Sequence, residues 1–191
     1  MAIRSNGAVV AELTLESPDG FAHILFSAIE QLLQRAEMSL ADVGCFAAAS
    51  GPGGFTGVRV GLAAVKGLTE ALGKRAAGIS NLRALACFGR AERRAVVIDA
   101  RRGEVYGAVY DSALNVVVPE TVQPLNSWLE SLPVRDYEFI CSDDGKLPAL
   151  ASAIALCAEI DWRSGSEQDP AALEANYVRR SDAELFWKDP Q

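Results

Sequence analysis

A glycine-rich loop between an apolar run and an amphipathic run constrains the fold of this chain more than any other feature. Residues 51–54 read Gly-Pro-Gly-Gly, and glycine supplies positive φ angles and lets another backbone come close. The apolar residues 44–49 before the loop have the length of a short buried strand. After the loop, apolar side chains recur at three-to-four spacing, which predicts a helix with Thr56 as its N-cap and Gly73 just past its end. Strand, tight turn and helix in this order predict an α/β domain.

The predicted helix carries small residues along one side. Gly61 and Gly67 lie in its interior, where each glycine costs about 1 kcal/mol relative to alanine. Gly57, Ala64 and Ala71 extend this small side. We interpret it as a surface for close approach of another backbone: the protein's own sheet, a ligand or a partner helix.

A glycine-rich loop that opens a helix is also typical of phosphate binding. The P-loop pattern requires Lys followed by Ser or Thr after its last glycine, and no register of residues 51–57 provides this. The dinucleotide-binding pattern, counted from Gly51 and Gly53, requires a third glycine where Thr56 stands. The sequence therefore argues against an unaided phosphate-binding loop.

Charge, histidine content and cysteine spacing narrow the possible functions. The net charge is -7, which is unfavourable for a protein that binds nucleic acid alone, because phosphate contacts need clustered Lys and Arg. Since His23 is the single histidine, a multi-histidine zinc site is excluded. We interpret His23 as an exposed helix residue rather than the base of a catalytic triad. The four cysteines include no Cys-x-x-Cys pair, which predicts core thiols for three of them rather than a disulfide framework.

The chain carries no sign of a membrane or secretory segment. No apolar run reaches the roughly 20 residues of a membrane span. The first ten residues, MAIRSNGAVV, lack the apolar centre of a signal peptide. We therefore expect a cytoplasmic protein without a membrane partner.

Hydrophobic periodicity and turn residues predict the remaining elements. In the first predicted helix, Phe26 is expected beside His23 on the exposed face. We expect Pro119 to end a strand, because proline cannot donate to a ladder. Strands are expected at residues 8–15, 44–49, 77–80, 95–100, 104–110, 114–118 and 137–142, and helices at residues 21–36, 56–72, 80–88, 125–132, 147–160 and 170–177.

Several segments resemble the TsaB (YeaZ) family. The stretch from Gly51 to Leu68, GPGGFTGVRVGLAAVKGL, is similar to the signature of that family. His23 falls where the family tends to carry a histidine. The similarity runs from about Val9 to Arg180, and it includes segments similar to the family's next strand and helix, its central hairpin and its C-terminal segment, at residues 78–86, 99–106 and 176–180.

The resemblance implies two ribonuclease H-like lobes of the actin-like ATPase (ASKHA) superfold, residues 1–92 forming the N-terminal lobe and residues 93–191 the C-terminal lobe. Family members begin with an apolar strand ending in Asp-Thr-Ser, whereas Met1 falls near the start of their second strand. We therefore expect a truncated first lobe that lacks its first strand. Either the true start lies upstream of Met1, with an in-frame extension of about fifteen residues, or this variant fills the gap in another way. That strand is central in such a lobe, so two neighbouring strands would lack ladder partners without it.

The resemblance also implies a function. TsaB proteins are the bacterial subunits needed to place threonylcarbamoyl on adenosine 37 of tRNA. By resemblance this chain is a non-catalytic scaffold subunit with no cofactor, metal or catalytic residue of its own. Its implied partners are a TsaD-like transferase paralogue and a TsaE-like ATPase, with a possible homodimer, and with tRNA contacted only through the complex. The implied partner interface is His23, Phe26, Gly57, Gly61 and Ala64, and the signature loop is Gly51, Pro52, Gly53, Gly54, Phe55, Thr56 and Gly57.

Two enzymatic alternatives remain open. A small actin-like phosphotransferase or ATPase would use Asp99 with the glycine-rich loop, and the Asp143-Asp144-Gly145 turn resembles a phosphate loop of that superfold. Any turn favours aspartate at such positions, so these acids also have a purely structural interpretation. A peptidase of the glycoprotease-like family, an activity once attached to these proteins, would need a nucleophile activated by His23.

Overall fold

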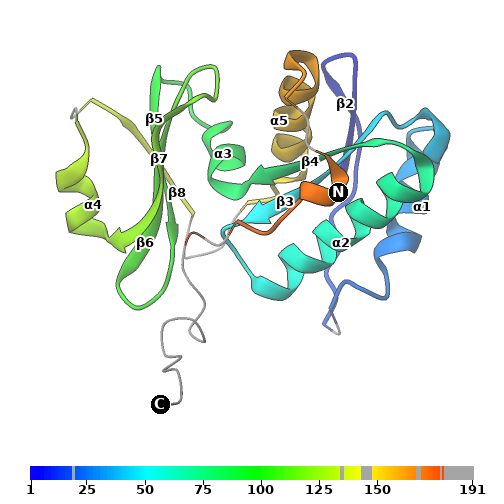
Figure 1. Cartoon of the computed structure of the whole chain (residues 1–191), viewed down its shortest axis with the longest axis horizontal. Helices are drawn as coiled ribbons and strands as arrows, with labels where there is room; N and C mark the ends of the chain where they lie inside the picture. The colour runs from blue at the N-terminus through cyan, green and yellow to red at the C-terminus, as the bar shows by residue number, and fades with distance from the viewer. Residues whose placement is uncertain (19, 134–135, 143–147, 167–168, 177, 179–191) are drawn as a thin grey trace.

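The computed structural model describes residues 1–18, 20–133, 136–142, 148–166, 169–176 and 178. Two groups of strands and helices lie side by side, with helix α3 (Asn81–Ala86) between them (Figure 1). The first group comprises the strands and helices of residues 1–80, and the second comprises those of residues 93–141. The fold is mixed α/β, as the glycine-rich unit predicted.

The second group is a four-stranded sheet formed by β5 (Arg93–Asp99), β6 (Glu104–Asp111), β7 (Val116–Pro124) and β8 (Glu138–Cys141). The strand order is β7-β6-β5-β8. β5 is antiparallel to β6 and parallel to β8, and β6 is antiparallel to β7. The turn from β5 to β6 has positive φ at all three of its residues, 101–103, so the predicted hairpin is confirmed. Helix α4 (Leu125–Ser131) lies between β7 and β8 in the chain.

The prediction that Pro119 ends a strand is wrong, because β7 continues to Pro124. β7 is an edge strand, and its register with β6 shifts beside Pro119. A proline is tolerated at such a position because no ladder partner needs its missing N–H.

The first group contains two separate two-stranded sheets among the described residues. β1 (Ala2–Ser5) and β2 (Ala8–Glu12) form an antiparallel hairpin. β3 (Cys45–Gly51) and β4 (Arg75–Ser80) pair in parallel. β1 therefore does not pair with β3, and each has one edge without a strand partner in the described part of the chain. The helices of this group are α1 (Leu25–Arg35) and α2 (Phe55–Leu72), with a 3-10 turn at Leu40–Asp42.

Helix ends were predicted with mixed success. The N-cap of α2 is Gly54 rather than Thr56, because the backbone of Gly54 is still extended and Thr56 already lies in the first turn. Gly73 ends α2 in the left-handed conformation, as predicted, and Ser80 caps α3 by accepting from Leu82 N. α1 begins at Leu25, so His23 lies in the turn before the helix rather than inside it.

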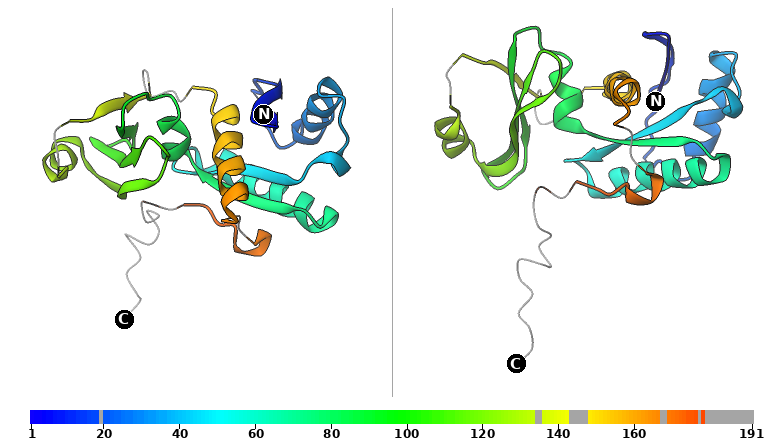
Figure 2. Two further views of the ribbon diagram at one scale, coloured as in Figure 1. Left: turned by 90° about the horizontal axis from the view of Figure 1, so that it is seen from above. Right: turned by 45° about the horizontal axis from the view of Figure 1, so that its top comes forward.

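The helix after β8 packs on the first group although it comes from the C-terminal part of the chain. This helix, α5 (Ala151–Ser164), contacts β1, β3, β4 and α3. Figure 2 shows α5 and α2 on opposite faces of the β3–β4 pair. The helix predicted at residues 170–177 is wrong, since only a 3-10 turn at Pro170–Ala172 forms before the chain becomes irregular up to Asn176.

The largest hydrophobic core lies where the two groups meet. Leu82 and Leu85 of α3 are buried there with Val96 of β5, Tyr110 of β6 and Cys157 of α5. Burial from both groups in one cluster holds them together. No helix in the described part of the chain is both long enough and apolar enough to span a membrane.

Candidate partner-binding site

The glycine-rich loop has a buried base and an exposed tip. Gly51 and Pro52 are buried, whereas residues 53–57 are exposed. Gly51 has a φ of 103°, and a Cβ there would lie 3.4 Å from the carbonyl oxygen of Asn176. A Cβ on Gly53 would lie 3.0 Å from Asn81 Nδ2. The positive φ therefore favours glycine at Gly51, and an added Cβ at Gly53 would crowd the Asn81 amide.

Two asparagines hold the base of the loop. The buried Asn81, at the start of α3, donates from Nδ2 to the carbonyl oxygen of Pro52 at 2.9 Å. The backbone N–H of Asn176 donates to the carbonyl oxygen of Ser50 at 2.7 Å. Two loop carbonyls are thus occupied by the protein itself, and the segment after the last 3-10 turn is attached to the end of β3.

The second group of strands reaches this loop through a short polar chain. Asn176 Nδ2 donates to Glu120 Oε2 at 2.6 Å, and the hydroxyl of Tyr110 donates to Glu120 Oε1 at 2.8 Å. Burial, followed by the charge of Glu120, raises the pKa of Tyr110 well above its ordinary value. Tyr110 therefore stays protonated and acts as a hydrogen-bond donor rather than as a base.

The exposed tip of the loop leads into an open surface. The Phe55 ring is 56% exposed, and the guanidinium carbon of Arg59 lies 3.7 Å from its centroid. A Cβ on Gly54 or Gly57 would meet no atom of the described residues within 4 Å. Packing against the described part of the chain thus does not explain why these two positions lack a side chain.

The predicted interface residues occupy two environments. His23 and Phe26 are exposed, Phe26 to 61%, which confirms their outward position. Gly61 and Ala64 are half-buried and line a cavity inside the first group, and a Cβ on Gly61 would lie 3.6 Å from Ala48 Cβ of β3. Gly57 is exposed in the first turn of α2, and α1 lies toward the other end of that helix (Figure 1).

The acids of the enzymatic alternatives do not form a site in the described residues. Asp99 accepts the backbone N–H of Arg101 at 2.8 Å and pairs with the Arg101 guanidinium at 3.5 Å, so it stabilises the hairpin turn. Asp143, Asp144 and Gly145 lie outside the described residues. Among the described residues, no group of three His, Cys, Asp or Glu side chains could hold a metal ion.

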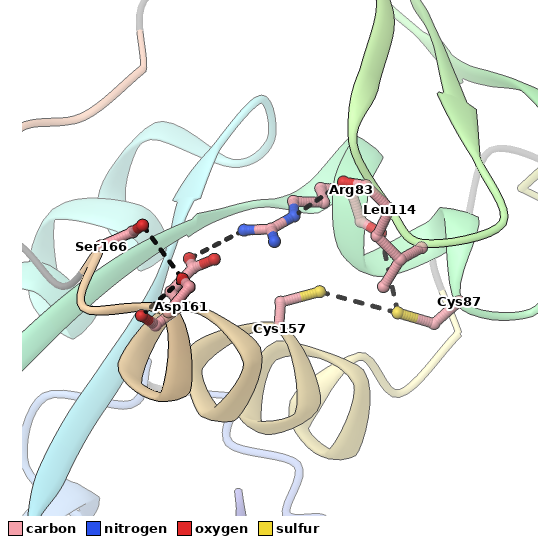
Figure 3. A network of polar contacts seen from close by, with 7 residues as sticks. Arg83, Cys87, Leu114, Cys157, Asp161 and Ser166 are labelled. Carbon is pink, nitrogen blue, oxygen red and sulfur yellow. Dashed lines mark hydrogen bonds and ion pairs between the residues drawn. The ribbon is translucent and has the colours of Figure 1, made fainter.

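A network at the junction of α3 and α5 was missed by sequence reasoning (Figure 3). Arg83 donates from Nη1 to Asp161 Oδ2 at 2.8 Å and from Nε to the carbonyl oxygen of Leu114 at 3.2 Å. Beside it the Sγ atoms of Cys87 and Cys157 lie 3.6 Å apart. The contact between these thiols lowers the pKa of Cys87 and raises that of Cys157, with burial adding to the rise. Nothing in the local sequence of either helix could reveal these partners, because Arg83 lies 31 residues from Leu114 and 78 from Asp161, and Cys87 lies 70 residues from Cys157.

Comparisons with known proteins agree with the resemblance found in the sequence. The family described as "TsaD: tRNA N6-adenosine threonylcarbamoyltransferase" matches residues 16–142. The tRNA threonylcarbamoyladenosine biosynthesis protein TsaB of Bacillus subtilis is 32% identical, and the match covers 100% of this chain and 93% of that protein. TsaB of Escherichia coli is 33% identical over 58% of this chain and 49% of its own length.

Solved structures show the same fold. A Pseudomonas aeruginosa protein described as similar to peptidase YEAZ has a TM-score of 0.75 and 26% identity, covering 93% of both chains. YeaZ from Pseudomonas aeruginosa has a TM-score of 0.73 and 27% identity, covering 92% of both chains. With the identity to the Bacillus subtilis protein over its whole length, this chain belongs to the TsaB (YeaZ) family of tRNA threonylcarbamoyladenosine biosynthesis proteins.

Proposed function

We propose that this protein is a non-catalytic scaffold subunit for the formation of N6-threonylcarbamoyladenosine at position 37 of tRNA. The observation that carries the proposal is the 32% identity to Bacillus subtilis TsaB over the whole chain. The hydrogen bonds to the carbonyl oxygens of Ser50 and Pro52 support it, because they hold the base of the glycine-rich loop in place and so position its exposed tip for contact with a partner. Its partners in this proposal are a TsaD-like transferase, which carries the chemistry, and a TsaE-like ATPase.

The two groups of elements are, in this proposal, two ribonuclease H-like lobes of the actin-like superfold. The same order of hairpin, helix and parallel strand in both groups supports this assignment. The division into residues 1–92 and 93–191 belongs to the same proposal. α5 crosses that division, because it comes from the second segment and packs on the first.

The partner surface in this proposal has two parts, the exposed face of α1 and the tip of the glycine-rich loop, which lie toward opposite ends of α2. Phe26 offers a large exposed ring beside His23, and aromatic side chains often anchor interfaces. Gly57 leaves open space at the start of α2. Gly61 acts here by letting α2 lie close to β3, and Ala64 lines the cavity beside it.

Reconstitution tests the function. A TsaD-type transferase and a TsaE-type ATPase from the same organism are incubated with tRNA and threonylcarbamoyl-adenylate, with and without this protein. The modified nucleoside is measured by mass spectrometry after digestion. We expect its formation to depend on this protein, and undiminished formation without it would reject the scaffold role.

A pair of variants tests the surface. Phe26→Glu places a charge at the proposed contact and is expected to weaken transferase binding at least about tenfold, as for an interface anchor. Leu129→Glu is the control, since Leu129 is an exposed helix residue of the other group, 40% exposed on α4. Equal binding by both variants, measured by calorimetry with unchanged melting temperatures, would show that the α1 face is not the interface.

A further inference from the structure

Two cysteine thiols face each other where α3 meets α5 (Figure 3). Cys87 is the C-cap residue of α3, Cys157 lies in the middle of α5, and their Sγ atoms are 3.6 Å apart. Both thiols are free. The sulfurs of a disulfide lie about 2.0 Å apart, and rotation of the two side chains about their Cα–Cβ bonds can close a gap of this size. The fold therefore brings two thiols from distant parts of the chain within reach of one covalent bond.

The two thiols differ in their access to solvent. Cys87 is half-buried at the end of its helix, whereas Cys157 is fully buried in the largest hydrophobic core. A small reagent from solvent therefore meets Cys87 first. Cys157 is shielded from solvent but lies against the Cys87 sulfur, so it is placed to react with a group that Cys87 carries.

The surroundings favour the thiolate form of Cys87. The contact with the Cys157 thiol lowers the pKa of Cys87, and the charges of Arg83 and Arg94 lower it further, against the opposing effect of burial. Arg94 is held next to Cys87, because its Nη1 donates to the carbonyl oxygen of Ala86 at 3.1 Å. The thiolate is the form of cysteine that attacks oxidants, so Cys87 is the more reactive of the two. The same contact, with burial, raises the pKa of Cys157 and keeps its thiol protonated.

We propose that Cys87 and Cys157 are a redox-active pair that hydrogen peroxide converts into an intramolecular disulfide between α3 and α5. In the first step the Cys87 sulfur attacks one oxygen of the peroxide and the O–O bond breaks. The departing hydroxide takes up the proton that the Cys87 thiol released, which gives water and a sulfenic acid on Cys87.

The second step closes the disulfide. The Cys157 sulfur attacks the Cys87 sulfur, the S–O bond breaks, and the leaving hydroxide takes the proton of the Cys157 thiol. In total the two thiols lose two electrons and two protons, and one peroxide is reduced to two waters. An added dithiol reverses the reaction by thiol–disulfide exchange and is itself oxidised.

The disulfide would join the two ends of the segment that forms the second group. Cys87 and Cys157 are 70 residues apart, and the four strands of the second group, residues 93–141, lie between them in the chain. Closing so long a loop restricts the unfolded chain, which stabilises the folded form. We therefore expect the oxidised protein to be the more stable one. This inference does not depend on the proposed scaffold role.

Peptide mapping tests the pair in the full chain. The reduced protein is treated with a small excess of hydrogen peroxide, remaining thiols are blocked with N-ethylmaleimide in denaturant, and the protein is digested with trypsin without reductant. Cleavage after arginine and lysine places Cys87 in residues 84–90 and Cys157 in residues 147–163. We expect these two peptides linked, at least about tenfold more abundant than any link that involves Cys45 or Cys141, because contact in the fold supplies a high effective concentration.

Matched controls identify what each thiol does. Cys141→Ala removes the exposed thiol of β8, outside the pair, and should leave the link unchanged. In Cys157→Ala, dimedone, which traps sulfenic acids, should label Cys87, whereas in Cys87→Ala it should leave Cys157 unlabelled. The same oxidation of the original chain in guanidinium chloride should abolish the preference for the Cys87–Cys157 link, because the fold no longer brings the thiols together.

The melting temperature gives a second measurement that needs no variant. We expect oxidation to raise it by at least about 5 °C and dithiothreitol to return it to the original value. A dominant Cys87–Cys157 link with this reversible rise would support the pair. The proposal would be overturned by a link no more abundant than the others, by Cys87 oxidised to the sulfinic acid without a link, or by a link that leaves the melting temperature unchanged or lowers it. Dimedone labelling of Cys157 in Cys87→Ala would overturn the assignment of Cys87 as the first thiol to react.

Discussion

Glycines in this protein differ sharply in what surrounds them. At Gly107 of β6 an added Cβ would lie 2.4 Å from Cε2 of Trp128, which is fully buried on α4. At Gly67, on the exposed side of α2, an added Cβ would meet no atom of the described residues within 4 Å. Packing against Trp128 thus requires glycine at position 107. At position 67 glycine only lowers the stability of the helix relative to alanine.

Alanine substitutions at these two positions should have opposite effects. We expect Gly67→Ala to increase the free energy of unfolding by about 1 kcal/mol, the difference in helix propensity. Gly107→Ala should decrease it by about 1–3 kcal/mol, because the new methyl group displaces the indole. Urea unfolding at equilibrium measures both. A loss of stability in Gly67→Ala would show that this side of α2 is packed against something after all.

A single carboxylate should carry part of the acid sensitivity. Glu138 accepts the backbone N–H groups of Ala91 at 2.7 Å and Arg90 at 2.6 Å, and these bonds lower the pKa of Glu138 below its ordinary value. A lowered folded-state pKa stabilises the fold above the unfolded-state pKa, and this stabilisation is lost as the pH falls through the folded value. Glu138→Gln should therefore have a lower melting temperature than the original protein at neutral pH. The difference in melting temperature should become smaller as the pH falls. A constant difference in melting temperature across the acid range would contradict this.

At the scale of elements, Arg83 of α3 adds a polar connection between the two groups to the hydrophobic core that they share. Arg83 donates hydrogen bonds to the carboxylate of Asp161 on α5 and to the carbonyl oxygen of Leu114, in the turn between β6 and β7. Both side chains of the ion pair are 20% exposed, so solvent screens the pair only partly. The position of α5 on the first group therefore depends on contacts that no periodic pattern in the chain encodes.

Replacing Arg83 tests this connection. We expect Arg83→Ala to reduce the free energy of unfolding by about 1–3 kcal/mol, because it leaves a carboxylate and a carbonyl without their donor. Arg163→Ala is the matched control. Arg163 pairs with Glu159 on the same helix, but it is 68% exposed, and such a pair contributes less than about 1 kcal/mol. Equal losses in chemical denaturation would mean that the Arg83 network adds nothing beyond a surface ion pair.

At the scale of the whole molecule, charge determines which partners can bind directly. The net charge of -7 opposes the polyanionic backbone of tRNA. In the proposed complex, contact with tRNA therefore belongs to the transferase. The neutral exposed features, Phe26 and the tip of the glycine-rich loop, are suited instead to a protein surface.

The isolated protein should bind tRNA weakly. We expect no saturable binding at low micromolar tRNA in fluorescence anisotropy, and only a shallow dependence between about 50 and 200 mM salt, because few phosphates would be neutralised. Adding the transferase should restore binding. Tight binding by the protein alone, with a steep loss on adding salt, would contradict the assignment of tRNA contact to the complex.

The sequence by itself determined the local units and the family of this protein. The glycine-rich loop with its following helix, the turn at residues 101–103 and the cap at Ser80 all depend on residues within one or two turns of each other, so spacing alone predicts them. The tertiary structure decided what no local pattern contains. Residues 50 and 176 meet at the base of the loop, α5 packs on the first group, and Gly61 faces β3 rather than solvent. The cavity lined by β1, α1, β3, α2 and α5 likewise exists only in the folded chain, because its walls come from elements that are far apart in the sequence.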